Sequence, residues 1–175
     1  EVKLSANRGM IIDRNGEPLA VSTPVDTVWA DPRKLAQHPQ EFARLAKALD
    51  RDKNWLARRV TSNLDREFVY LVRHMRPADA AKVKALGITG VDTLREYRRY
   101  YPAGEVTGHL LGFTNVDDVG QEGLELAFDQ WLGGEPGIKR VMRDREGRTI
   151  EDIERIKAPR PGQDLRTSID LRVQY

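Results

Sequence analysis

The sequence contains no cysteine. Disulfide bonds and thiolate metal sites are therefore excluded, whereas the absence of cysteine fits a reducing or an oxidising compartment equally well. No segment approaches the ~20 consecutive apolar residues that a membrane-spanning helix requires, and no signal-peptide pattern is present. The chain starts at Glu1 and stops at Tyr175, within what reads as a new structural unit. We therefore expect a fragment of a longer protein.

The sequence also lacks an excess of charge of one sign. Its 29 Lys and Arg residues face 27 Asp and Glu residues, which gives a net charge of +2 with both signs interleaved. Binding to nucleic acid requires a net basic surface, so we expect no nucleic-acid partner. With 39% hydrophobic and 32% charged residues, the 175 residues are enough for one sizeable domain or two small ones with much surface.

Motifs that bind metals, bind cofactors or carry catalysis are missing too. The three histidines, His38, His74 and His109, lie far apart in the sequence and have no partner at metal-ligand spacing. No phosphate-binding loop and no nucleophile motif of the G-x-S-x-G type occurs. Carboxylates are numerous, so an acid–base pair formed in space is not excluded. The sequence thus predicts no metal, no cofactor and no identifiable catalytic residue.

The beginning of the chain predicts a β-hairpin over residues 9–22. Met10 to Ile12 supply the first strand, Asn15-Gly16 is a favoured hairpin turn, and Leu19 to Val21 supply the return strand. Pro18 donates no backbone hydrogen bond and therefore suggests that the return strand starts at a sheet edge. Residues 24–32 continue in an extended pattern.

Helices are expected next. Phe42, Leu45, Ala46 and Leu49 share one helical face, and Asp52 is the expected N-cap of a second helix. Residues 66–75 are rich in β-branched and aromatic residues and predict a strand. A further helix over 77–86 should begin at a proline and end at a glycine, with the strand 90–101 after it.

The second half of the chain predicts one long helix and several strands. A turn at 102–104 and a short helix within 105–113 come first. Residues 120–134 then predict a single helix, which glycines end. Its expected apolar face consists of Leu124, Ala127, Phe128, Trp131 and Leu132. Residues 138–157 and 163–170 read as strands, with a linker at 158–162 between them.

This order predicts an α+β fold in which strands at both chain ends form one sheet. An isolated hairpin is only marginally stable, so the hairpins at residues 9–22 and around 144–147 are expected to join. We expect an elongated strand-rich stalk from residues 1–30 and 138–165. A mixed α+β head, 31–137, would be inserted between them, and 166–175 would begin a further domain.

Basic residues alternate with tyrosines in the strand that ends at Tyr101. Arg95, Tyr97, Arg99 and Tyr101 would share one side, which could stack on sugars or bases. The simpler interpretation is a half-buried strand whose tyrosines pack while its arginines pair with acids. The balanced charge of the chain favours the second interpretation.

Four segments together resemble the non-catalytic N-terminal module, called the pedestal or dimerisation domain, of class B penicillin-binding proteins. They are RGMIIDRNGEPLA at 8–20, RRYYPAG at 98–104 with HLLGF at 109–113, GQEGLELAFDQWLGGEPG at 120–137 and DREG at 144–147. The resemblance covers nearly the whole chain and is weakest over residues 32–87. It is greatest to the division-specific D,D-transpeptidase of Gram-negative bacteria.

The resemblance implies a parent protein with an N-terminal membrane anchor, this module in the periplasm, and a C-terminal domain that cross-links septal peptidoglycan. That domain uses S-x-x-K, S-x-N and K-T-G motifs. S-x-x-K and K-T-G are missing here, and Ser5-Ala6-Asn7 fits S-x-N only by chance. The chain itself should therefore neither cross-link peptidoglycan nor react with β-lactams. The implied role is spacing and docking.

The implied partners are the SEDS-family glycosyltransferase, other divisome membrane proteins and the protein's own transpeptidase domain. Self-association is possible through exposed strand edges. The membrane would be contacted only through the anchor outside this sequence, at the inner membrane. Two alternatives of other classes are a glycan-binding module that uses the strand Arg95–Tyr101 and an enzyme with hydrolytic carboxylates of its own.

The residues of the shared motifs are candidates either for the internal structure or for an interface. They are Arg8, Gly9, Asp13, Arg14, Asn15, Gly16, Arg99, Tyr101, Pro102, Gly104, His109, Gly112, Gly123, Glu125, Asp144 and Gly147. Gly9 and Gly16 suit close backbone approach and positive φ. Our hypothesis is that several of Arg8, Asp13, Arg14, Arg99 and Glu125 form a buried ion network. The competing interpretation is that they face a partner.

Overall fold

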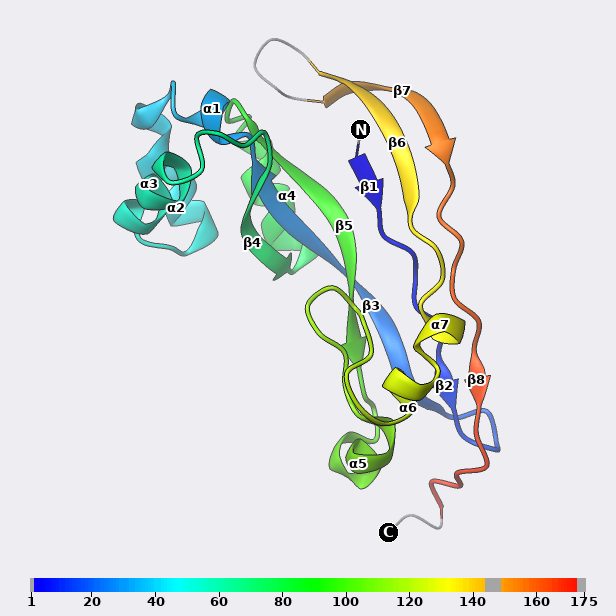
Figure 1. Ribbon diagram of the computed structural model, residues 1–175. Coiled ribbons are helices and arrows are strands. Elements are labelled where there is room, and N and C mark those ends of the chain that lie inside the picture. The colour runs from blue at the N-terminus through cyan, green and yellow to red at the C-terminus, as the bar shows by residue number, and fades with distance from the viewer. Residues whose placement is uncertain (1, 144–148, 173–175) are drawn as a thin grey trace. The chain divides into compact units, whose positions relative to one another are not determined.

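The computed structural model describes residues 2–143 and 149–172 (Figure 1). The strands are β1 (Val2–Leu4), β2 (Ile11–Ile12), β3 (Pro18–Ala30), β4 (Val69–Met75), β5 (Val91–Tyr100), β6 (Gly137–Arg143), β7 (Thr149–Lys157) and β8 (Leu165–Arg166). The α-helices are α1 (Pro32–Leu35), α2 (Phe42–Leu49), α3 (Lys53–Thr61), α4 (Pro77–Ala85), α5 (Gly108–Leu111), α6 (Gly123–Ala127) and α7 (Asp129–Leu132), and the 3-10 helices are η1 (Pro39–Glu41) and η2 (Gly104–Val106). The predicted α+β class is confirmed.

The hairpin predicted at the start of the chain is present as β2 and β3. The two strands are antiparallel, with Ile11 opposite Ala20 and Ile12 opposite Pro18, and the register shifts between these two pairs. β2 also pairs in parallel with β8, where Ile11 lies opposite Leu165. The sheet runs in the order β4-β3-β2-β8, with β5 also paired to β3.

The expectation that both hairpins belong to one sheet is wrong. β6 and β7 lie in a second, three-stranded sheet of order β1-β6-β7. The edge of β2 that does not face β3 pairs with β8. β6, the first strand of the second hairpin, pairs with β1 instead. The two chain ends therefore do pair with each other, but in two separate sheets. The hairpin turn expected around residues 144–147 lies outside the described residues.

The chain divides into two compact units. Unit 1 comprises residues 1–2, 25–96 and 139–155. Its core packs the faces of α2, α3 and α4 with β3, β4 and β5. The predicted α2 face is buried, and the Asp52 side chain accepts a hydrogen bond from the Asn54 backbone N–H at 2.6 Å, as its predicted N-cap role requires.

Unit 2 comprises residues 3–24, 97–138 and 156–175. Its core is a smaller cluster of buried side chains, namely Ile11, Leu19, Ala20, Leu111, Leu132 and Ile169. The cluster joins the first hairpin to α5, α7 and the segment that follows β8. The stalk-and-head division at residues 30, 138 and 165 stays a prediction.

The single helix expected over 120–134 is wrong. Two short helices, α6 and α7, meet at Phe128, which leaves the helical conformation with φ −112° and ψ 24°. Phe128 and Trp131 are exposed, whereas Glu125 is fully buried. The helical pattern assumed that apolar residues face inward, but an interior polar network holds the carboxylate of α6 inside.

Among the described residues, the helices are all too short or too polar to cross a bilayer.

Candidate functional site

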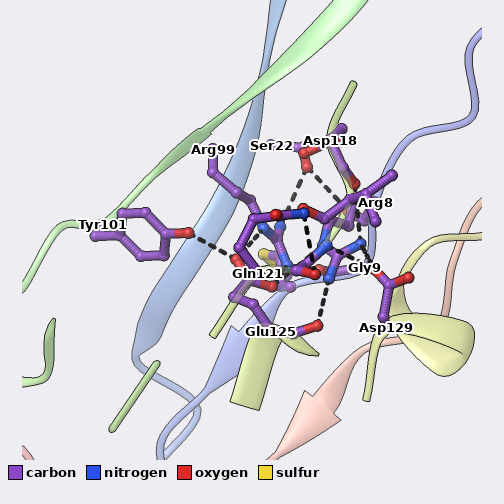
Figure 2. Close-up of polar contacts among 12 residues, drawn as sticks. Arg8, Gly9, Ser22, Arg99, Tyr101, Asp118, Gln121, Glu125 and Asp129 are labelled. Carbon is purple, nitrogen blue, oxygen red and sulfur yellow. Dashed lines mark hydrogen bonds and ion pairs between the residues drawn. The ribbon is translucent and has the colours of Figure 1, made fainter. Parts of the chain in front are cut away.

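The centre of the polar network in unit 2 is the carboxylate of Glu125, which is fully buried (Figure 2). Arg99 donates from Nε to Oε2 at 2.8 Å and from Nη2 to Oε1 at 3.1 Å. Arg8 donates from Nε to Oε1 at 3.1 Å, and the Tyr101 hydroxyl donates to Oε2 at 2.8 Å. One carboxylate thus accepts hydrogen bonds from three side chains of two distant segments.

Arg8 extends the network to the neighbouring helix. Its Nη1 donates to the Asp129 carboxylate at 2.7 Å and to the backbone carbonyl of Asp118 at 3.1 Å, and its Nη2 donates to the backbone carbonyl of Glu125 at 2.9 Å. The side chain is 1% exposed. A lysine ammonium could not reach these acceptors together, because the contacts depend on the planar fork of a guanidinium.

Arg99, at the end of β5, ties the same carboxylate to the first hairpin. Beyond Glu125, its Nη2 donates to the Gly9 carbonyl at 2.5 Å and its Nη1 donates to the Ser22 hydroxyl at 3.1 Å. Ser22 in turn donates to the Arg8 carbonyl at 3.2 Å. Every link joins segments more than 10 residues apart, so the network fixes tertiary structure rather than local structure.

Sequence reasoning found Arg8, Arg99 and Glu125 but missed Ser22, Asp118 and Asp129. One signal for Asp129 was available, because it stands four residues after Glu125. Like charges at this spacing repel on one helix face unless a cation lies between them. Arg8 is that cation. No comparable signal pointed to Ser22 or Asp118, because the contacts of Ser22 with Arg99 and of Asp118 with Arg8 join residues far apart in the sequence.

Asp118 has two unusual features. Its backbone is left-handed, with φ 62°, and its Oδ1 is buried without a hydrogen-bond partner among the described residues. The pKa of this carboxyl is raised from 3.8 to about 6, chiefly by burial; the charges of Arg8 and Arg99 oppose the rise, and those of Glu125 and Asp129 add to it. The Asp118 side chain therefore titrates in a pH range in which ordinary carboxyls are ionised.

Tyr101 is half-buried against Glu125. Burial raises its pKa well above the ordinary value of 10.0, and the negative charge of Glu125 raises it further, because ionised tyrosine would place two anions together. The phenol therefore keeps its proton and remains a donor to the carboxylate.

Asp13 and Arg14 lie apart from the Glu125 carboxylate. Asp13 closes the β2–β3 turn by accepting hydrogen bonds from the backbone N–H groups of Asn15 and Glu17, both at 2.8 Å. Burial alone would raise the pKa of Asp13, but hydrogen bonds from the N–H groups of Glu17, Asn15 and Leu171 hold that pKa below 3.8. The Asp13 side chain therefore stabilises the turn.

The same turn holds the end of the described chain. The Arg14 N–H donates to the Ile169 carbonyl at 2.8 Å, and the Leu171 N–H donates to the Asp13 carboxylate at 3.4 Å. The Asn15 amide donates to the Asp170 carboxylate at 3.3 Å. The turn at residues 13–16 therefore contacts the segment 169–171.

Two motif glycines have clear backbone reasons. A Cβ on Gly9 would lie 2.0 Å from the Gln163 carbonyl oxygen, so no larger residue fits there without a backbone shift. Gly16 has φ 85° in the hairpin turn, with open space around it. The remaining motif residues lie in or beside the turn after β5 and helices α5 and α6, namely Pro102, Gly104, His109, Gly112 and Gly123. Asp144 and Gly147 lie outside the described residues.

Two carboxylates of the network are engaged within the protein. Glu125 and Asp129 are both paired with arginines, and no group of side chains in the described ranges could hold a metal ion. The glycan-binding alternative is weakened as well. Arg99 and Tyr101 bind Glu125, and Arg95 pairs with Asp26 at 2.7 Å. Three of the four side chains proposed to face a sugar are thus engaged within the protein.

Comparison with known proteins agrees with this reading. The family model described as the penicillin-binding protein dimerisation domain matches residues 3–167. The probable peptidoglycan D,D-transpeptidase PbpC of Pseudomonas aeruginosa is 45% identical over 100% of this chain and 31% of its own length. The peptidoglycan D,D-transpeptidase FtsI of Escherichia coli K12 is 45% identical over 98% of this chain and 30% of its own length. The chain thus spans about a third of these relatives.

A solved structure shows the same fold. The complex between penicillin-binding protein PBP2 and MreC from Helicobacter pylori aligns with a TM-score of 0.69 and 23% identity, over 99% of this chain and 37% of the other. The family match and the two relatives at 45% identity cover nearly every residue. The chain therefore belongs to the penicillin-binding protein dimerisation-domain family and is a module of the class B penicillin-binding proteins.

Proposed function

We propose that the chain is the non-catalytic module of a septal peptidoglycan D,D-transpeptidase. It positions the penicillin-binding domain and binds proteins of the division machinery. The parent protein would be anchored in the inner membrane by a segment outside this sequence, with the module in the periplasm. Residues 1–30 and 138–165 would act as the spacer, 31–137 as the head, and 166–175 as the start of the catalytic domain.

The observation that carries the proposal is the internal use of the motif residues. Arg8, Arg99 and Glu125 are buried and bind one another, so they are not free to serve as acid, base or nucleophile toward a substrate. Such a network suits a module whose task is to hold a fixed geometry. The hairpin turn that binds residues 169–171 would fix the direction in which the chain leaves toward the catalytic domain.

Binding of partners is supported by analogy with one structural neighbour. The Helicobacter pylori PBP2, which shares this fold, was solved in complex with MreC. For a division-type protein such as the FtsI relative, we propose that the partners are the SEDS-family glycosyltransferase and other divisome membrane proteins.

A chimera tests this function. Residues 1–175 would replace the matching segment of Escherichia coli FtsI, with the anchor and catalytic domain of FtsI retained. On depletion of native FtsI, the chimera should support septation, bind fluorescent penicillin and co-purify with the glycosyltransferase of the host. A matched chimera that carries a flexible linker instead should bind penicillin but fail to divide. Normal division with the linker would contradict the proposal.

A further inference from the structure

The segment between Tyr100 and Ile138 has a charge unlike the rest of the chain. It contains no Lys or Arg and seven Asp or Glu, although the whole sequence has slightly more basic than acidic residues. Glu125 and Asp129 are paired with Arg8 and Arg99, which both lie outside this segment. Glu105, Asp117 and Glu122 are exposed. The outer surface of this segment is therefore acidic.

The same segment carries most of the large apolar side chains that the described residues expose. Eight of the twelve belong to it, each between 41% and 54% exposed: Val106, Leu110, Phe113, Val116, Val119, Leu126, Phe128 and Trp131. Isolated exposed apolar residues are ordinary, but a concentration in one segment marks a surface that another molecule covers. We call residues 104–131 the acidic–apolar segment.

Backbone contacts hold the parts of this segment against each other. The Gln121 N–H donates to the Phe113 carbonyl at 2.9 Å, and Thr114 pairs with Gly120 in an antiparallel bridge. A Cβ on Gly123 would lie 2.5 Å from the Leu110 carbonyl oxygen, so α5 and α6 pack closely. An open hollow of about 640 Å³ is lined by residues 126–131. The exposed side chains thus stand on one connected group of elements within unit 2.

We propose that the acidic–apolar segment binds a partner polypeptide whose apolar side chains are flanked by Lys and Arg. The assignment rests on the proposed docking function and adds its surface and its partner chemistry. Charge complementarity decides between occupants. A second copy placed face to face would set acid against acid, and an anionic lipid headgroup would be repelled in the same way. A basic amphipathic strand or helix satisfies both the charge and the apolar side chains.

The test uses three synthetic peptides that vary charge and hydrophobicity separately. One is an amphipathic Leu/Lys peptide, the second replaces Lys by Glu, and the third replaces Leu by Ser. Each is titrated into the 175-residue chain, and amide chemical shifts map the contact. Only the Leu/Lys peptide should bind with saturation, and the shifts should fall within residues 104–131.

Two double variants and a matched control locate the site. Glu105→Lys with Glu122→Lys, and Phe113→Ser with Leu126→Ser, should each weaken binding of the Leu/Lys peptide by about tenfold, because charge and apolar contact both contribute. The control, Leu64→Ser with Asp65→Lys, changes an exposed apolar and acidic pair in unit 1 and should leave binding unchanged. Circular dichroism checks that each variant is folded.

Several results would overturn the proposal. They are equal binding of the Leu/Lys and Ser/Lys peptides, chemical shifts outside the segment, a dimer in sedimentation that the Phe113→Ser/Leu126→Ser pair abolishes, or binding of anionic vesicles that this pair abolishes. None of them bears on the chimera, which reports whether the module supports division at all. A chimera that divides normally with all four substitutions would refute this surface and leave the proposed function intact.

Discussion

Arg99 holds the carboxylate of Glu125 with two hydrogen bonds, from Nε at 2.8 Å and from Nη2 at 3.1 Å, in the interior of unit 2. The pair joins the end of β5 to α6, and Arg8 adds the segment before β2. A buried carboxylate is unfavourable unless it is paired and its remaining oxygen positions are satisfied. Both conditions are met at Glu125, so the motif residues support one another and depend on one another.

Removal of the charge at the centre should destabilise the protein strongly. Glu125→Gln leaves Arg8 and Arg99 adjacent in the interior with no anion between them. We expect a loss of about 3–5 kcal/mol in the free energy of unfolding, measured by urea denaturation. The control is Asp79→Asn, which removes the partner of Arg76 in a largely exposed pair and should cost about 0–1 kcal/mol. Equal effects of the two variants would contradict the interior role.

Substitution of glycine by alanine should have different effects on stability at Gly9 and Gly108. Gly9→Ala places its Cβ against the Gln163 carbonyl and should cost about 1–3 kcal/mol, because backbone must move on both sides. Gly108→Ala is the matched control at the start of α5, where nothing lies within 4 Å of the new atom. It should change stability by less than about 1 kcal/mol and in the stabilising direction. Thermal unfolding of both variants makes the comparison.

Asp118 should give the protein a pH dependence. The native protein binds this proton more tightly than the unfolded chain does, since the pKa of the carboxyl is raised from 3.8 to about 6, chiefly by burial. Its contribution to stability is therefore present at low pH and is lost as the pH rises from 3.8 through about 6. Arg8 and Arg99 reduce the effect, and Glu125 and Asp129 add to it.

The measurement for Asp118 is the difference in unfolding free energy between wild type and Asp118→Asn as a function of pH. Asparagine tolerates the left-handed backbone and carries no charge. The variant should gain stability over wild type as the pH rises through that range. Asp65→Asn, an exposed carboxyl, controls for the general loss of one negative charge. A flat difference curve would mean that Asp118 is not buried as described.

Tyr101 should resist ionisation. The Tyr101 hydroxyl donates to the buried carboxylate of Glu125, and its pKa is raised by burial and by the charge of Glu125. In a spectrophotometric alkaline titration, Tyr101→Phe should remove the last-ionising component and leave the earlier ones unchanged. The same variant should lose about 1.5–3 kcal/mol of stability, because it takes a hydrogen bond from a charged group. Loss of an early component would place the hydroxyl in solvent.

The sequence predicted local structure better than it predicted long-range contacts. The spacing of Phe42, Leu45 and Leu49 located α2 and its buried face, and Asp52 marked the start of α3, because these features depend only on neighbours in the chain. The pairing of β8 with β2 depends on which of several strands is placed beside the free edge of β2 in the folded chain. Periodicity contains no information on that choice, and the prediction of a single sheet was wrong.

For the candidate site too, the sequence indicated which residues matter but not which of them meet in space. Motif residues brought Arg8, Arg99 and Glu125 together as candidates, but no pattern distinguished them from Asp13 and Arg14, which serve the turn instead. Phe128 and Trp131 were predicted to face inward from a helix over 120–134, because the apolar face of a helix usually packs against the protein interior. Leu124 and Leu132 of the predicted face do pack in the core, but Phe128 and Trp131 do not, because the interior beside them holds the ionic network of Glu125.

A double-mutant cycle between Arg99 and Glu125 tests the central claim most directly. The free energy of unfolding would be measured for Arg99→Ala, Glu125→Ala and the double variant. Because both side chains are buried and bind each other, we predict a coupling energy of about 2 kcal/mol or more. Additive effects, within about 0.5 kcal/mol, would contradict the account and favour a surface at which each residue meets a partner separately.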